Sequence, residues 1–363
     1  MEGIIRAVCL SEKKGVVKRP VEEGKLIENH GLQGDAHAGT WHRQVSLLSY
    51  DKIEQFNLSA GGDFQVSDGD FGENLVAEGI DFSALPVGTR FIIHSGGSAI
   101  SGAAVPADGC ADSPAGDDGA DDKGGYSSEK NAGNTAAGEA EGGPVLELTQ
   151  IGKQCHSDCA IRQRMGDCIM PREGVFARVI RGGKVRKGDR MSVQMPDTDR
   201  PFTAAVVVLS DKGAAGERED KSGPAAAAML KEAGYTVVDT IVLPDEEGLI
   251  QNCLKELADR RQVDLVVTSG GTGFSLRDRT PEATMAVADR VAPGIAEAIR
   301  MKSMAITDRA MLGRGVSVIR KGTLIVNLPG SPKAVEESLG FILGALDHGL
   351  RILRGSAGEC ARS

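Results

Sequence analysis

The sequence is poor in aromatic residues and contains no long apolar run. Phe, Tyr and Trp make up 4% of the 363 residues, and no stretch approaches the roughly 20 consecutive apolar residues that a transmembrane helix requires. The N-terminal stretch also lacks the apolar core of a signal peptide. These absences argue against a membrane protein, and we expect a cytoplasmic one.

An excess of basic residues is also missing. Lys and Arg number 42 against 51 Asp and Glu, which gives a formal net charge of -9, and no basic stripe with interleaved aromatic residues is present. This balance argues against a nucleic-acid partner. The seven cysteines are odd in number and unevenly spread, so they do not indicate the disulfide framework of a secreted protein.

What remains is the composition of a globular protein with one unusual segment. Apolar residues make up 40% and charged residues 26% of a chain that is long enough for two separate cores. Between residues 97 and 143 the sequence consists mainly of Gly, Ala, Ser and Asp. Such a segment cannot bury enough apolar surface to offset its chain entropy, and we predict a disordered, low-complexity insertion.

The most informative pattern is a buried strand that runs into a glycine-rich loop. The β-branched run at 265–267 predicts the strand, and Gly270, Gly271 and Gly273 end it. Such glycines bring backbone N–H groups close to an anion, and the helix that begins near Thr280 adds its N-terminal dipole. The pattern predicts a phosphate-binding loop. A glycine turn without a ligand is the alternative that this run alone leaves open.

Charged residues near the ends of predicted strands complete this site. Arg277 offers a cation for phosphate, and Asp278 offers a carboxylate able to hold Mg²⁺. Alternating strands and helices predict a parallel α/β sheet, whose ligands bind at the carboxyl ends of the strands. Asp211 and Asp245 follow the first two of these strands and join the same edge. For Asp245, a helix cap is the alternative.

The stretch SGGTGFSLRDRTPEAT at 269–284 resembles the signature of the MoaB/Mog family of molybdopterin-binding proteins, whose active members adenylylate molybdopterin. The resemblance extends over about 203–353 and includes LPDE at 243–246 and NLPGSPK at 327–333. It implies that Asp245 and Asp278 are catalytic and hold Mg²⁺ with ATP, and that this domain forms a homotrimer. The implied cofactor-binding residues are Ser269, Gly270, Gly271, Thr272, Gly273, Arg277, Thr280, Pro329, Gly330 and Ser331.

The N-terminal half has the pattern of a β-rich domain. Strands are predicted over 3–10, 14–18, 45–48, 90–94 and 145–150. The glycine-flexed loop at 31–39 contains Asp35 and His37 and is followed by His42 and Arg43. This group of side chains is able to bind an anion or a metal. A polar turn whose side chains satisfy backbone groups is the alternative.

A group of thiols follows the predicted strand at 145–150, and it comprises Cys155, His156, Cys159 and Cys168. Their spacing fits no standard zinc signature closely, although a structural metal site stays open. A second thiolate near the first also suits the resolution of a persulfide.

These landmarks together resemble a MOSC domain, the β-barrel module named for molybdenum cofactor sulfurases, over about residues 1–195. The supporting motifs are GLQGDAHAG at 31–39, FGENL at 71–75, LPVGTR at 85–90, FARV at 176–179 and GKVRKGD at 183–189. The resemblance assigns sulfur carriage or molybdenum ligation to Cys155. It also implies a mostly-β barrel.

Both resemblances point to molybdenum or tungsten cofactor biosynthesis. We predict a MOSC barrel at 1–195, a linker at 196–202, and a three-layer α/β domain with a mainly parallel sheet at 203–355. The predicted function is Mg²⁺-dependent adenylylation of molybdopterin by ATP, with molybdenum insertion proteins and molybdoenzymes as partners. A non-catalytic carrier or sensor of the cofactor is the main alternative. A third is a reductase component acting on hydroxylated bases through the MOSC half.

Overall fold

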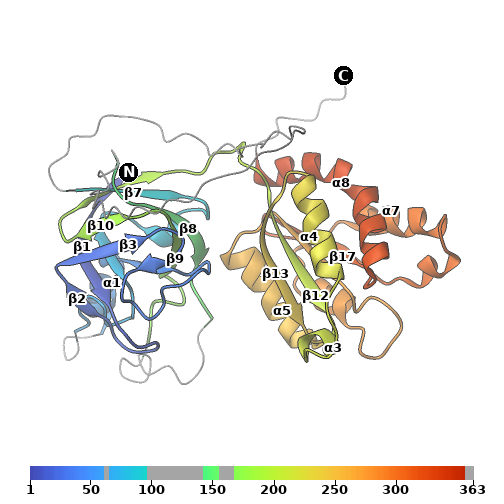
Figure 1. Ribbon diagram of the computed structural model, residues 1–363, viewed down its shortest axis with the longest axis horizontal. Coiled ribbons are helices and arrows are strands. Elements are labelled where there is room, and N and C mark those ends of the chain that lie inside the picture. The colour runs from blue at the N-terminus through green and yellow to red at the C-terminus, as the bar shows by residue number, and fades with distance from the viewer. Residues whose placement is uncertain (61–64, 96–141, 155–166, 356–363) are drawn as a thin grey trace, which may run out of the picture.

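The computed structural model describes residues 1–60, 65–95, 142–154 and 167–355. These residues form an N-terminal barrel and a C-terminal α/β region, joined by the segment between β11 and β12 (Figure 1). Of the predicted insertion, only residues 142 and 143 lie within the described ranges, and Cys155, His156 and Cys159 lie outside them. Within these ranges, every helix is too short or too polar to cross a membrane.

The N-terminal region is a closed barrel, as predicted. Eight strands pair in the order β11-β7-β8-β9-β5-β6-β1-β2, and β11 also pairs with β1, which closes the sheet on itself. A smaller sheet has the order β10-β3-β4. Its elements are β1 (Glu2–Leu10), β2 (Arg19–Val21), β3 (Glu23–Ile27), β4 (Gly31–Leu32), β5 (Val45–Ser49), α1 (Tyr50–Ser59), β6 (Leu75–Glu78), η1 (Phe82–Ala84), β7 (Arg90–His94), β8 (Val145–Ile151), β9 (Val175–Arg181), β10 (Gly183–Arg186) and β11 (Arg190–Gln194).

Alternating burial along the strands fills the barrel interior. β7 alternates between half-buried and buried residues, and its inward-facing Phe91 meets Phe82 edge to face at 5.2 Å between ring centroids. Alternation with period two is the pattern of a sheet with one face on a core. The strand predicted over 14–18 is wrong, because the chain turns there through Gly15 with a φ of 76°.

The C-terminal region alternates strands and helices. Its elements are β12 (Thr203–Leu209), α3 (Asp211–Ala214), α4 (Ser222–Glu232), β13 (Thr236–Leu243), α5 (Glu247–Lys255), η2 (Glu256–Arg260), β14 (Leu265–Ser269), α6 (Thr280–Ala286), β15 (Arg290–Val291), α7 (Pro293–Met304), η3 (Asp308–Leu312), β16 (Ser317–Arg320), β17 (Thr323–Leu328) and α8 (Pro332–Arg354). Together they build the predicted three-layer fold.

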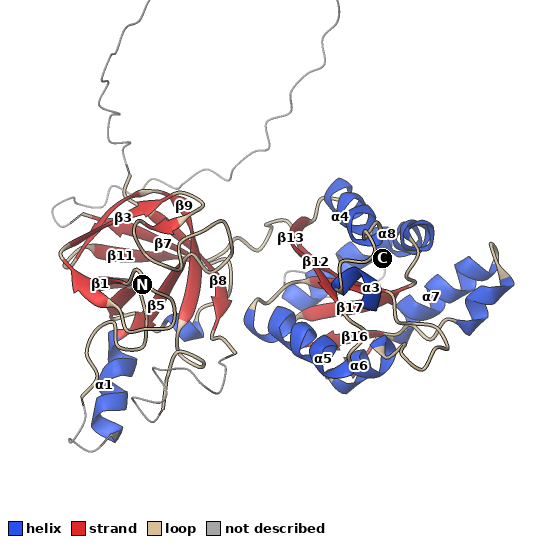
Figure 2. Ribbon diagram, turned by 60° about the horizontal axis from the view of Figure 1, so that its bottom comes forward, coloured by secondary structure: helices blue, strands red, loops and turns tan. Residues whose placement is uncertain are grey.

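The sheet has the order β13-β12-β14-β17-β16-β15, in which the first four strands are parallel, β16 is antiparallel to β17, and β15 is antiparallel to β16. Alternate residues of β12 belong to two different cores. Val206 packs with α4 and α8 on one face, and Val207 packs with α5 and α6 on the other. Figure 2 shows these helices on opposite sides of the sheet. Because four strands are parallel, the loops that follow them meet at one edge.

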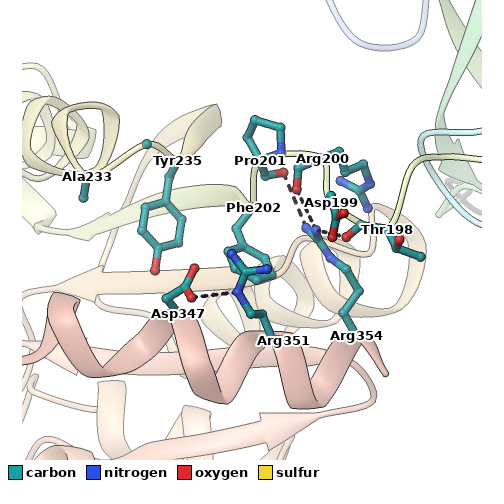
Figure 3. A pocket seen from close by; sticks show the side chains of 11 residues that line it. Thr198, Asp199, Arg200, Pro201, Phe202, Ala233, Tyr235, Asp347, Arg351 and Arg354 are labelled. Carbon is teal, nitrogen blue, oxygen red and sulfur yellow. Dashed lines mark hydrogen bonds and ion pairs between the residues drawn. The ribbon is translucent and has the colours of Figure 1, made fainter. Parts of the chain in front are cut away.

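The segment that enters β12 is held by an arginine of α8. Arg354 donates hydrogen bonds to the backbone oxygens of Thr198 and Arg200, at 3.1 and 2.7 Å, and lies over the ring of Phe202 (Figure 3). A cavity of about 190 Å³ lies beside this contact. It sits where β12 and β13 begin, at the amino ends of the parallel strands, so it is remote from the edge at which their loops meet.

Candidate functional site

The glycine-rich loop after β14 has a backbone that only glycine adopts easily. Gly270 and Gly271 have φ values of 106° and 64°. A Cβ added to Gly270 would lie 2.3 Å from the backbone oxygen of Leu209, so the loop crosses directly over the end of β12. The sequence pattern predicted this positive φ, and the crossing requires it.

The loop presents four consecutive backbone donors that have no acceptor in the part of the chain that the structure describes. Among the described residues, none accepts a hydrogen bond from the N–H groups of Gly271, Thr272, Gly273 or Phe274. Further along the loop, Ser275 N–H is satisfied by the Asp278 carboxylate at 3.0 Å. A run of free N–H groups beside the start of a helix is the backbone arrangement that binds phosphate.

Asp245 and Asp278 lie on either side of these donors. A Cβ added to Gly271 would lie 2.8 Å from Asp245 Oδ1, and one added to Gly273 would lie 2.8 Å from Asp278 Oδ2. The pKa of Asp245 is raised by burial and by the negative charges of Asp211 and Asp278. A carboxylate whose ionised form is destabilised in this way is stabilised by a bound cation.

Arg277 belongs to an ion-pair network in this structure. Its guanidinium donates to Asp211 at 2.8 and 3.1 Å and to Glu246 at 2.9 Å. Asp211 also accepts a hydrogen bond from Asp245 N–H at 3.0 Å. The network therefore links the loops that follow β12, β13 and β14. Because the Arg277 side chain is half exposed, an anion at this edge is able to compete for it.

The loop after β17 closes the site from the other side. Ser269 Oγ donates to Pro329 O at 3.2 Å, and a Cβ added to Gly330 would lie 3.2 Å from Gly270 Cα. Ser331 caps α8, where its hydroxyl accepts from Ala334 N–H at 3.2 Å. Thr280 Oγ1 donates to Gly270 O at 3.0 Å. The two loops are therefore stabilised by contacts of Ser269, Thr280, Pro329 and Ser331.

The donor set suits Mg²⁺. Asp245 Oδ1 is buried and has no hydrogen-bond partner among the described residues. No group of three or more His, Cys, Asp or Glu side chains in that part of the chain is arranged to hold a metal. Mg²⁺ is commonly held by one or two carboxylates together with substrate phosphates. Asp245 and Asp278 match that type of site better than a cage made of protein ligands alone.

Replacing Gly271 with alanine tests the shape of the loop. The new Cβ would lie 2.2 Å from Thr280 Oγ1 in a backbone that disfavours side chains, so we expect ligand binding to fall and stability to drop by roughly 1–3 kcal/mol. Thermal melting and phosphate-ligand titration measure both effects. Gly340→Ala is the matched control, because its Cβ meets open space on α8 and should stabilise the helix by about 1 kcal/mol. Equal ligand binding and equal stability of the two variants would contradict the assignment of this segment as a phosphate-binding loop.

In the barrel, Asp35 is engaged in a buried ion pair. Lys18 Nζ contacts both of its carboxylate oxygens, at 2.8 and 2.7 Å, and the backbone N–H groups of Ser11 and His37 donate to the same carboxylate. Burial alone would raise the pKa of Asp35, but His37 and Lys18 outweigh it and hold that pKa well below its usual range. Asp35 is therefore ionised and braces its own loop.

His42 and Arg43 lie close to the end of β8. His42 Nε2 is 2.9 Å from Gln150 Oε1, and the Arg43 guanidinium lies over the rings of Trp41 and Phe176. Burial, with help from the charge of Arg261, lowers the pKa of His42 to about 4. The His42 side chain is therefore neutral and lies beside β8, the strand that precedes Cys155 in the sequence.

The cysteine group divides between described and undescribed residues. Cys168 is buried with Ile169, Met170 and Phe176 in an apolar cluster. Cys155, His156 and Cys159 lie outside the described residues, so their roles stay predictions from the sequence.

Sequence reasoning missed two residues that shape these sites. Lys18 pairs with Asp35 across 17 positions, and Arg314 contacts the glycine-rich loop across 36 to 41 positions. Neither residue belongs to a local motif. The signal that was available is the chemistry of Asp35, because a carboxylate on a glycine-flexed loop requires a cation nearby when it becomes buried.

The fold and site define a class: an α/β domain that binds phosphate groups at the carboxyl edge of a parallel sheet. Residues 205–348 match the family described as "Probable molybdopterin binding domain", and residues 34–113 match the MOSC domain. The chain belongs to the molybdopterin-binding family through its C-terminal region, and it combines that domain with a MOSC domain.

Two relatives share this region. The molybdopterin adenylyltransferase of Haemophilus influenzae is 46% identical over 136 residues, which cover 37% of this chain and 69% of the relative. The molybdopterin adenylyltransferase of Helicobacter pylori is 39% identical over 153 residues, covering 42% of this chain and 87% of the relative. The crystal structure of the molybdopterin biosynthesis enzyme MoaB from Thermus thermophilus is 44% identical, with a TM-score of 0.41, and covers 42% of this chain and 97% of that one.

Proposed function

We propose that the C-terminal domain adenylylates molybdopterin with ATP. A terminal phosphate oxygen of the pterin attacks the α-phosphorus of ATP, the bond between the α- and β-phosphates breaks, and pyrophosphate leaves. The observation that carries this proposal is the row of four N–H groups at 271–274, which find no acceptor among the described residues and lie between Asp245 and Asp278. Such a reaction requires mainly the alignment of two polyanions and the neutralisation of their charge.

Each residue has a distinct task in this proposal. Gly271, Thr272 and Gly273 bind a phosphate through the backbone, with Ser269, Gly270 and Thr280 fixing the turn. Pro329, Gly330 and Ser331 line the opposite side. Arg277 leaves Asp211 or Glu246 to contact phosphate when substrate binds. Each of these contacts strengthens as negative charge gathers on the transferring group.

Asp245 and Asp278 would hold Mg²⁺, which supplies charge neutralisation for the triphosphate when bound. The orphaned Oδ1 of Asp245 and the repulsion among three carboxylates favour such a cation. As pH falls, protonation of Asp245 competes with Mg²⁺. Since the pKa of Asp245 is raised, metal affinity should begin to fall at a higher pH than for an ordinary aspartate.

The alternative function is a carrier or sensor that binds the cofactor without turning it over. Pyrophosphate release separates the two. An adenylyltransferase releases pyrophosphate only when ATP and molybdopterin are both present, whereas a carrier binds the pterin and releases none. The presence of both Asp245 and Asp278 beside the loop favours the enzyme.

For the MOSC domain we propose cofactor binding or the carriage of sulfur or molybdenum by Cys155. His42 contacts Gln150 near the end of the strand that precedes that cysteine, and the adjacent Arg43 offers a cation for an anionic ligand, whereas Asp35 is already paired with Lys18. We place the domain boundaries at 1–195, 196–202 and 203–355. Molybdenum insertion proteins and molybdoenzymes are the proposed partners in a cytoplasmic pathway.

We also propose a homotrimer through the C-terminal domain. Several large apolar side chains on α7, η3 and the turn between them are exposed in the single chain: Met301, Met304, Ile306, Met311 and Leu312. A patch of this kind is typical of a protein–protein interface. Sedimentation of the full chain measures its oligomeric state, and a monomer at micromolar concentration would rule the trimer out.

A further inference from the structure

Arg314 contacts the glycine-rich loop from the side opposite its free donors. The residue lies between η3 and β16. Its backbone N–H donates to Thr272 O at 3.0 Å, its Nε donates to Gly273 O at 2.7 Å, and its Nη2 donates to Asp278 O at 2.6 Å. One arginine thus holds the carbonyl groups at both ends of the segment 272–278.

These contacts set the direction of the loop's donors. In a trans peptide the C=O and N–H bonds point in opposite directions. Because the carbonyl groups of Thr272 and Gly273 face Arg314, the N–H groups of Gly273 and Phe274 face away from it. These are two of the four donors that find no acceptor among the described residues.

The guanidinium is itself fixed. Its Nη1 pairs with Glu282 at the start of α6. Burial would raise the pKa of Glu282, but a backbone hydrogen bond and Arg314 outweigh it and hold that pKa below its usual value. Arg300 donates to the backbone oxygens of Gly313 and Gly315, at 3.1 and 3.2 Å, and so holds the chain on both sides of Arg314.

We propose that Arg314 is a positioning residue for adenylyl transfer, because it orients the peptide groups whose N–H bonds bind substrate phosphate. The identity of the substrates rests on the proposed function. All three guanidinium nitrogens have acceptors within the protein, and two of these acceptors are carbonyl oxygens of the loop itself, so Arg314 acts through the loop and does not touch phosphate. Lysine has one nitrogen and cannot reproduce this set of contacts.

The test compares Arg314→Lys with Arg320→Lys in the full chain. Arg320 lies on β16, the strand that follows Arg314, and it too bonds a carboxylate and a backbone oxygen, those of Asp259 and Val287, but none of its hydrogen bonds among the described residues involves the loop. Three quantities are measured: adenylyl transfer, calorimetric binding of inorganic tripolyphosphate, and amide hydrogen exchange of the peptide 270–279. Arg314→Lys should lower kcat/KM by about 10²-fold, the scale of a misplaced reactant. It should also weaken tripolyphosphate binding and speed exchange in the loop, and Arg320→Lys should match the wild type.

Glu282→Gln serves as a second variant, which loosens the guanidinium of Arg314 but keeps its carbonyl contacts. A loss of about 10-fold in kcat/KM is expected, as for one weakened contact. If Arg314→Lys does not fold, the Glu282→Gln variant tests the positioning role of Arg314. Wild-type tripolyphosphate binding in the folded variants would overturn the proposal, as would an equal loss in Arg320→Lys. If the wild type transfers no adenylyl group while Arg314→Lys still weakens tripolyphosphate binding, the positioning role stands and the proposed function fails.

Discussion

Asp245→Asn is expected to lower adenylyl transfer by at least ~10²-fold, the scale of losing one electrostatic stabiliser of the transition state. The same change should raise the melting temperature at neutral pH. Burial and the charges of Asp211 and Asp278 raise the pKa of Asp245. Its ionised form is therefore less favourable in the folded chain than in the unfolded chain, and a neutral amide removes that penalty.

The pH dependence fixes the sign of this effect. A carboxyl whose folded pKa is raised costs stability above that pKa, and the cost disappears below about pH 4, where the group is protonated in both states. The stabilisation by Asp245→Asn should therefore vanish on acidification. Asp278→Asn should lower transfer to a similar extent, and Glu336→Gln on the exposed face of α8 should change neither quantity. Full activity of Asp245→Asn would remove the carboxylate from the proposed mechanism.

Asp35→Asn is expected to destabilise the barrel by about 3–5 kcal/mol, since it leaves the charge of Lys18 buried without a counter-ion. Both side chains of this pair are almost completely buried, at 1% and 0% exposure. The pKa of Asp35 lies below its usual range, so its ionised form contributes stability at neutral pH; burial lowers the pKa of Lys18 and offsets part of that contribution. The contribution of ionised Asp35 is lost as pH falls through its lowered pKa.

Denaturant unfolding, followed by a probe confined to the barrel, measures this loss. Trp41 provides one, because it is the only tryptophan in the sequence and its indole N–H donates to His37 O at 2.8 Å. Glu23→Gln is the control, because its pairs with Lys184 and Arg186 are exposed and should contribute little. Lys18→Met combined with Asp35→Asn should lose less than Asp35→Asn alone. The account of this pair fails if Asp35→Asn and Glu23→Gln unfold alike.

The sequence predicted features whose cause is local. Gly270 and Gly271 require positive φ wherever a buried strand turns sharply, and Asp245 and Asp278 follow strands whose parallel order is evident from the alternation of elements. The closed barrel was expected from a resemblance carried by short motifs, and the pairing of β11 with β1 confirms it.

Features that depend on long-range contacts could not be predicted. Lys18 lies in a stretch that was expected to be a strand, and its burial depends on a loop 17 residues away. Arg314 is a single arginine between two glycines, and its role depends on hydrogen bonds to carbonyl groups of another loop. Arg277 was expected to face phosphate, and its engagement by Asp211 and Glu246 depends on the packing of three loops at one edge.

The most direct test of the central claim is to incubate the purified chain with molybdopterin, Mg²⁺ and ATP labelled in its α-phosphate. The proposed function predicts that the label appears on the pterin, that pyrophosphate is released in equal amount, and that Asp278→Asn slows both by at least ~10²-fold. If the wild-type chain binds molybdopterin but the label stays in ATP, the domain is a cofactor carrier and the adenylyl-transfer account is wrong.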